Sequence, residues 1–127
     1  MIPPIFQIVR DHAPATALLG TNPTRFWPFA EAPRDANGVP SGGTPYALWQ
    51  TVYGTPFNTL SCRPAEDQWG VQVDVYAPNA RVARDVSAAI RDAVEGDAYV
   101  VSWNGESKDE PTGLFRISFT VEFITDR

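Results

Sequence analysis

The strongest alternation of hydrophobic and polar residues in this sequence lies near its end. Between residues 114 and 124 the two kinds of residue take turns, which predicts a strand with one aromatic-rich buried face and one polar face. Residues 70–77 alternate in the same way and predict a second, half-buried strand. The apolar positions of the two strands are Phe115, Ile117, Phe119, Val121 and Phe123 in the first and Val71, Val73 and Val75 in the second.

A helical period occupies residues 79–95. Apolar residues recur there at intervals of three and four, which predicts an amphipathic helix with one face against a core. Asn79 opens this helix and Gly96 ends it, while Arg81 and Asp85 are spaced to pair on its polar side. The apolar stripe consists of Val82, Val86, Ala89, Ile90, Ala93 and Val94.

Shorter hydrophobic segments predict the remaining elements. Two short helices precede Gly20, and the break between them falls near Pro14. Three further strands are expected at residues 25–29, 46–53 and 98–103. Segments rich in glycine, proline or other turn-forming residues predict long loops at about 31–45, 54–67 and 104–113.

The order of these elements indicates an α+β fold, because antiparallel hairpins surround one long helix and no βαβ alternation is present. We expect a single domain over residues 1–127. In it, a mainly antiparallel sheet carries the helix at about 79–95 and a short helical N-terminus on one face. The length of the chain also fits one domain with one core.

The composition leaves few residues for catalysis or metal binding. The chain has one histidine, His12, and one cysteine, Cys62, too few for most metal-ligand sets or any internal disulfide. His12 lies at a predicted helix end, where the helix dipole favours it without any catalytic role. No phosphate-binding glycine motif is present. We therefore predict that the protein is not an enzyme and has no catalytic residues, cofactor or metal site.

The charge of the chain is acidic and uneven. Ten basic and fifteen acidic residues give a net charge of −5, which argues against a protein that binds nucleic acid by neutralising phosphates. Residues 1–64 sum to +1 and residues 65–127 to −6. The acidic pairs at 66–67 and 109–110 fall in predicted loops, where carboxyl groups keep ordinary pKa values. The segment 95–110, at −4, indicates a solvated hairpin tip or an acidic face turned toward a partner or a channel.

Neither end of the chain suggests a membrane protein. The first twenty residues lack the basic start and apolar stretch of a signal peptide. No segment approaches the roughly 18 apolar residues that span a bilayer. We expect a protein made in a reducing cytoplasm that contacts no membrane.

Candidate partner-contact residues come from the aromatic residues and the charged loops. Three of the four tryptophans fall at predicted strand ends, where they either fill the core or anchor an interface. The charged candidates lie in or beside the predicted loops. Together the candidates are Trp27, Arg34, Asp35, Arg63, Glu66, Asp67, Trp69, Trp103, Glu106, Asp109 and Glu110.

Several segments, taken in order, resemble the tail-completion (tail-terminator) protein family of long-tailed phages and prophages. The similarity covers nearly the whole chain and rests on order, length and the strand-helix junction near Tyr76. No catalytic motif takes part in it. The segments are residues 1–6, 25–29, 31–33, 45–50, 71–77, the alanine- and arginine-rich helix after them, and 116–119.

The resemblance implies a structural virion protein at the junction between tail and neck. It would form a ring, a hexamer, on the last ring of the tail tube, stop tube polymerisation and present a surface to a head-side stopper or adaptor protein. DNA would meet it only in passage through the channel. The loops at 31–45 and 54–67 would be docking elements. The alternatives are another neck component, such as a stopper or adaptor, and a small ligand-binding domain or enzyme.

Overall fold

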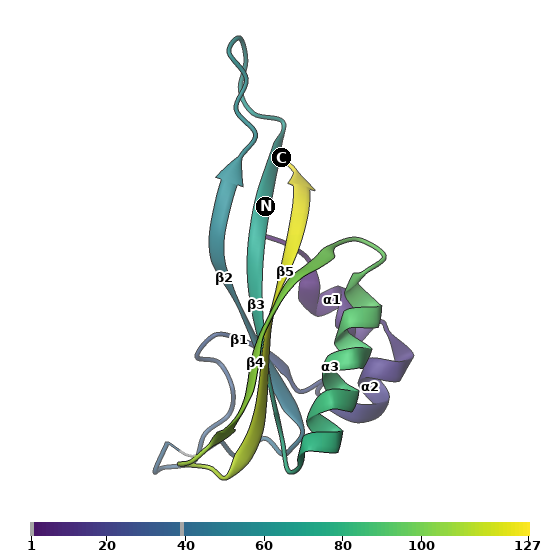
Figure 1. Ribbon diagram of the computed structural model, residues 1–127, viewed down its shortest axis with the longest axis vertical. Coiled ribbons are helices and arrows are strands. Elements are labelled where there is room, and N and C mark those ends of the chain that lie inside the picture. The colour runs from purple at the N-terminus through teal and green to yellow at the C-terminus, as the bar shows by residue number, and fades with distance from the viewer. Residues whose placement is uncertain (1, 39) are drawn as a thin grey trace.

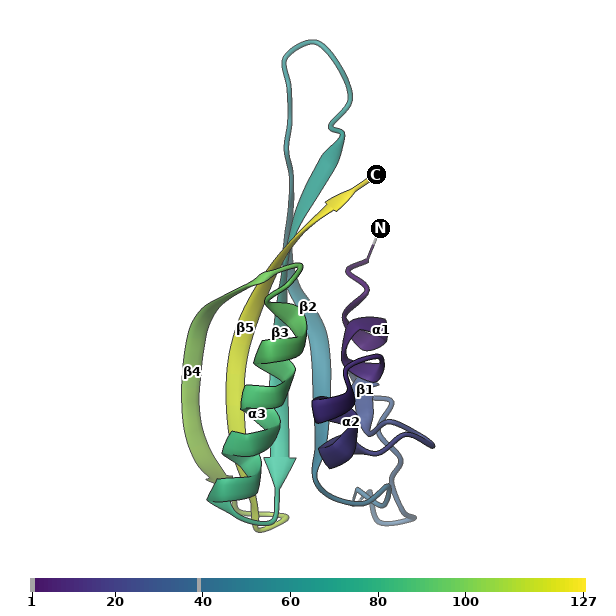
Figure 2. The same ribbon diagram turned by 90° about the vertical axis from the view of Figure 1, so that its right-hand side faces the viewer.

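The structure, a computed structural model, describes residues 2–38 and 40–127, which form one sheet with three helices on one of its faces (Figures 1 and 2). Met1 and Val39 of the predicted segments lie outside the described residues. The strand order is β1-β2-β3-β5-β4, with β1 parallel to β2 and all other neighbours antiparallel. The predicted α+β class with one long helix is confirmed. The elements are α1 (Ile5–Arg10), α2 (Ala13–Leu19), β1 (Phe26–Pro28), β2 (Tyr46–Pro56), β3 (Glu66–Ala77), α3 (Ala80–Val94), β4 (Tyr99–Asp109) and β5 (Leu114–Asp126).

The two central strands, β3 and β5, follow the predicted alternation. Val73 pairs with Phe119, and both side chains are fully buried in the core. The next pair, Asp74 and Ser118, carries polar side chains to the opposite face, which no helix covers. The sheet therefore has an apolar face beneath the helices and a polar open face.

Helix α3 begins at the predicted cap, because the Asn79 side chain accepts a hydrogen bond of 2.9 Å from the backbone N–H of Val82. Its apolar stripe packs against β3 and β5. Arg81 and Asp85 approach to 4.0 Å on the exposed side, as the i, i+4 spacing predicts.

The N-terminal helices are held against the sheet by Arg25. Its guanidinium donates to the carbonyl oxygens of Leu18 at 3.0 Å and Pro45 at 2.8 Å, so one side chain joins the end of α2 to the start of β2. Gly20 ends α2 with a positive φ of 86°. A side chain at position 20 would meet the Arg25 guanidinium at 2.8 Å, so the glycine also makes room for this link.

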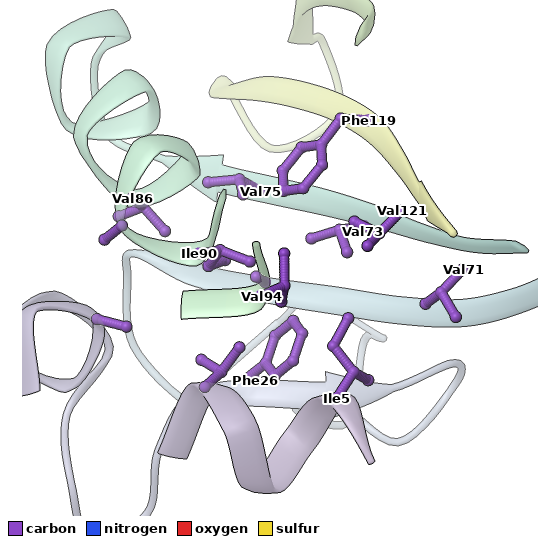
Figure 3. Packing of buried hydrophobic residues seen from close by; sticks show 14 of the residues in the cluster. Ile5, Phe26, Val71, Val73, Val75, Val86, Ile90, Val94, Phe119 and Val121 are labelled. Atoms are coloured by element: carbon purple, nitrogen blue, oxygen red, sulfur yellow. The ribbon is translucent and has the colours of Figure 1, made fainter. Parts of the chain in front are cut away.

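The core lies between the helices and the apolar face of the sheet (Figure 3). Val86, Ile90 and Val94 of α3 point toward the buried valines and phenylalanine of β3 and β5, while Ile5 and Phe26 close the core from below in that view. Burial of each such side chain stabilises the fold by about 1.5–3 kcal/mol, so this layer holds the three helices in place.

Three strands extend into segments predicted to be loops. The segment 54–67 is not entirely loop, since β2 continues to Pro56 and β3 already begins at Glu66. Likewise β4 runs through the predicted loop at 104–113 as far as Asp109. The prolines and Gly105 indicate turns, but cross-strand pairing continues each strand further than these residues suggest. The register shifts in β2 and β4, one of them at Gly105 with its φ of 116°, form bulges within the strands.

A hairpin made by the ends of β2 and β3 extends well beyond the helices. We call residues 52–67 the arm (Figures 1 and 2). Both chain termini lie near its base. The helices lie over the central part of the sheet, and the arm is the part of the molecule that reaches furthest along the long axis.

Candidate functional site

The arm carries large apolar side chains in contact with solvent. Phe57 and Leu60 are exposed near its tip, and Val52 and Tyr53 are exposed along β2. The tip is ordered by Thr59, whose hydroxyl donates to the Cys62 carbonyl oxygen at 2.8 Å. An ordered, apolar projection of this kind is typical of a segment that docks on another protein.

Two aromatic rings fix the arm to the sheet. Tyr53 lies across Gly70 on the open face and donates a hydrogen bond of 2.8 Å to Glu122 of β5. This bond, followed by burial, raises the pKa of the Tyr53 phenol. On the other face the Trp69 ring lies against Gly54, where an added Cβ would approach it to 2.6 Å. Both glycines are needed because the rings occupy the space that any side chain would fill.

The base of the arm is closed by an ion pair between β3 and the chain end. Arg127 donates two hydrogen bonds of 3.0 Å to Asp67, which is buried. These bonds hold the pKa of Asp67 below its usual value. The prediction that the 66–67 pair lies in a solvated loop with ordinary pKa values is therefore wrong for Asp67. Nearby, the indole N–H of Trp69 donates to Thr125 at 2.9 Å. Because β3 begins at Glu66, Trp69 lies within a strand rather than at its end.

One end of the sheet, which we call the β4 side, has a hollow between α3 and β4. It has a volume of about 400 Å³ and is lined by Trp103 and Ile117 among others. Trp103 is 52% exposed and packs on Phe119 with ring centres 4.9 Å apart. Arg84 of α3 crosses the hollow and donates two hydrogen bonds, of 2.7 and 3.0 Å, to the Glu106 carboxylate of β4. Hydrogen bonding to Arg84 lowers the pKa of Glu106.

The opposite end, the β1 side, has a second hollow of about 640 Å³ between the N-terminal segment, β1 and β2. Trp27 and Trp49 line it together with Ile2, which is 54% exposed. Phe29, directly after β1, is also exposed. Trp27 thus lies on a surface that is both apolar and open to a partner.

A third hollow, of about 340 Å³, lies where the 29–45 connection meets the open face. Arg34 and Asp109 line it beside Tyr46 and Tyr76, whose rings stack 5.1 Å apart. Burial, with Tyr76 close by, raises the pKa of Tyr46 to about 12. The structure therefore brings together two predicted candidates that are 75 positions apart in the sequence.

The structure separates other candidates. Glu106 turns to the helix face of β4, where it pairs with Arg84, whereas Asp109 lines a hollow on the open face. The predicted acidic segment is therefore not one acidic face. Asp35 caps a local turn by accepting from the Asn37 N–H, and Arg63, with Cys62, is exposed at the arm tip. Glu110 is exposed in the turn before β5, and Glu66 is exposed at the start of β3.

Sequence reasoning missed the polar network on the open face. Arg116 donates to Asp74 at 2.7 Å, and the Gln72 amide donates to the same carboxylate. Asn104 of β4 donates to Thr120 of β5. The only sign of this network in the sequence is that polar residues occupy every second position of the strands. Which of these side chains meet depends on the register between strands, which the sequence pattern does not give.

Within the described residues, no group of three or more His, Cys, Asp and Glu side chains is placed to hold a metal ion. No helix among residues 2–38 and 40–127 has the length and apolar character to cross a membrane. His12 precedes α2, and its side chain makes no capping hydrogen bond.

Comparison with known proteins places the chain. The family model described as tail completion protein gp17 matches residues 3–126. Among solved structures, a chain from "Virion of native gene transfer agent (GTA) particle" is similar, with a TM-score of 0.66 and 19% sequence identity. The match covers 97% of this chain and 92% of that one, and at this identity it shows a shared fold. No curated protein matches the sequence.

The family match confirms the resemblance seen in the sequence. It covers all three helices and all five strands among the described residues, so it concerns the whole fold rather than one motif. A structural role in a phage-type virion tail follows from it. This chain belongs to the family of tail completion protein gp17.

Proposed function

We propose that this chain caps a tail tube as a homomeric ring, a hexamer. The ring ends tube polymerisation and forms the joining surface for a head-side stopper or adaptor protein. DNA passes through its channel without being held. The observation that carries the proposal is the family match over residues 3–126. The fold shared with a chain of a gene transfer agent virion supports it.

The shape of the protomer suits a ring of this kind. A cyclic ring uses heterologous contacts, so each protomer needs two different lateral surfaces. The β1 side and the β4 side differ and lie at opposite ends of the strand order. The arm projects along the long axis, away from both, and is suited to reach a neighbouring ring.

Polymerisation stops when a cap offers the tube only one matching face. The arm extends from one end of the protomer, while the turn before β5 and the 29–45 connection lie at the other. A ring of such protomers has two unlike faces. One binds the tube, and the other rejects further tube subunits but accepts the connector.

Deletion of the gene tests the capping role. We expect overlong tails that lack heads, seen by electron microscopy of lysates. Normal tails joined to heads would refute a role in tail completion. Tails of normal length that lack heads would instead assign the chain to the stopper or adaptor class. Pulldown against the tube protein and the portal-side protein separates these outcomes.

The arm can be tested with one exposed residue. Leu60→Asp puts a charge on the apolar tip, and we expect the yield of completed particles to fall at least about tenfold, the effect of losing about 1.4 kcal/mol of binding. Ser61→Asp is the matched control, because it adds the same charge to an already polar, exposed position. Equal yields from the two variants would exclude docking through Leu60.

A further inference from the structure

The helix layer does not cover the whole sheet. Helix α3 packs against β3 and β5, and α1 packs against β1. Strand β4 lies at the edge beyond α3, and the hollow of about 400 Å³ separates them. Trp103 and Val101 are exposed along this edge. One side of the Trp103 ring covers Phe119, but about half of the residue stays in contact with solvent beside the hollow, so the β4 side has the character of an interface.

The β1 side has a matching character. Its hollow of about 640 Å³ is lined by Ile2 and Phe6 from the N-terminal segment and by Trp27 and Trp49 from the sheet. The indole N–H of Trp49 is buried and has no acceptor among the described residues. A buried donor without a partner costs stability, and an occupant of this hollow that brings an acceptor would satisfy it after a small shift of the ring.

We propose that the β4 side of one protomer packs against the β1 side of the next copy of this chain. The inference rests on the proposed ring and states which surfaces join its subunits. The two sides lie at opposite ends of the strand order, as a heterologous contact requires. Each side leaves aromatic or aliphatic side chains exposed that the other can cover.

Charge favours this pairing over the pairing of like sides. The hollow of the β4 side is lined by two arginines, Arg84 and Arg91, and one acidic residue, Glu106, a net of +1. The hollow of the β1 side is lined by one charged residue, Glu31, a net of −1. Opposite net charges favour contact between a β4 side and a β1 side, whereas two β4 sides or two β1 sides bring like charges together. The Glu106 carboxylate is also an acceptor that the β4 side can offer to the free Trp49 donor.

The contact is made by side chains rather than by a continuous sheet. Strand β4 has register irregularities between Val100 and Ser102 and between Trp103 and Gly105. Bulges of this kind twist an edge and interrupt its row of free backbone groups, so the edge is a poor template for another strand. Trp103 and the hollow beside it remain as the contact surface.

Crosslinking on assembled tails tests the pairing. In a Cys62→Ser background, Ala88→Cys lines the β4 hollow and Gln7→Cys lines the β1 hollow. The protein with both cysteines is added to purified tail tubes and treated with a flexible bis-maleimide. We expect a ladder of linked species up to the closed ring on denaturing gels. Either cysteine alone should leave monomers, because like sides do not meet.

The controls separate this inference from the ring itself. Ala88→Cys with Thr120→Cys, which lies on the open face of the sheet and outside both hollows, should give no ladder. Trp103→Glu should abolish ring formation on tubes, while Leu60→Asp at the arm should leave subunit contacts intact once rings form. If untreated protein makes no ring on tubes, the proposed function fails. If rings form but the double variant gives no ladder, or Ala88→Cys alone gives dimers, the pairing is wrong.

Discussion

Strand β3 passes through two environments. Residues 71–77 lie beneath the helices, where three valines are fully buried, while residues 66–70 form the base of the arm and its last residues, which no helix covers. The first half is held by burial of apolar area against α3. The second half is held by a few specific contacts, namely the Tyr53 and Trp69 rings over their glycines and the pair formed by Asp67 and Arg127.

The difference separates stability from docking. Burial is a collective term, so damage to the covered half should unfold the whole sheet. The contacts of the arm are local, so damage there should loosen the arm and leave the core folded. A tail protein benefits from this division, because its docking segment can vary without loss of the fold.

The largest effect should come from the covered half. Phe119→Ala removes a fully buried ring that packs on both Trp103 and the core, and we expect it to lower the free energy of unfolding by about 3–5 kcal/mol. Urea unfolding followed by circular dichroism measures this change. Phe29→Ala, at a 66% exposed site, is the control and should change stability by less than about 0.5 kcal/mol.

A smaller and local effect should follow from Gly70→Val. The new side chain displaces the Tyr53 ring, breaks its hydrogen bond to Glu122 and costs about 1–3 kcal/mol. Hydrogen exchange should speed up in residues 52–67 but not in α3. Gly96→Ala is the matched control, because nothing lies within 4 Å of an added Cβ there. Loss of protection across α3 as well would show that arm and core are not separate.

The smallest effect concerns pH. Since Arg127 lowers the folded pKa of Asp67, the unfolded chain binds more protons below the ordinary value of 3.8. The pair therefore stabilises the arm fully above that value, and the stabilisation is lost as the pH falls through the depressed pKa. The Trp69 indole N–H resonance, next to the pair, should report this loss in an NMR titration.

Arg127→Gln should move the midpoint of the Trp69 titration to higher pH, because Asp67 then loses the hydrogen bonds that lower its pKa. Arg81→Gln, which takes away an almost fully exposed guanidinium elsewhere, should not change it. An unchanged titration in Arg127→Gln would mean that Arg127 does not lower the pKa of Asp67 and that strand pairing alone holds Asp67 in position.

The sequence predicted the covered half of the molecule well. Alternation at 71–77 and the helical stripe at 82–94 reflect burial on one face, which period alone reveals. It predicted the arm poorly, because Pro56 and Pro64 signal a loop, whereas pairing between β2 and β3 extends the hairpin as far as Pro56 and Asp67. One signal was present: the dipeptides Tyr53-Gly54 and Trp69-Gly70, which antiparallel pairing sets opposite one another.

The candidate contact residues were predicted with uneven results for the same reason. Trp103 and Trp27 are accessible, but Asp67 is buried by a partner 60 positions away, and Glu106 and Asp109 point to opposite faces of one strand. Residue type and local pattern suggest which side chains seek partners. Which partners they find depends on register and on the path of the chain end, and neither is encoded locally.

The position of the chain termini has a practical consequence. Because both lie near the base of the arm, an affinity tag or fluorescent protein fused to either end would crowd the surface proposed to meet a neighbouring ring. The turn at residues 110–113, at the far end of the molecule, is a better place for an insertion than either terminus, because Glu110 is exposed and Gly113 has open space around it. A label placed there would leave the arm free and would mark the opposite face of the proposed ring.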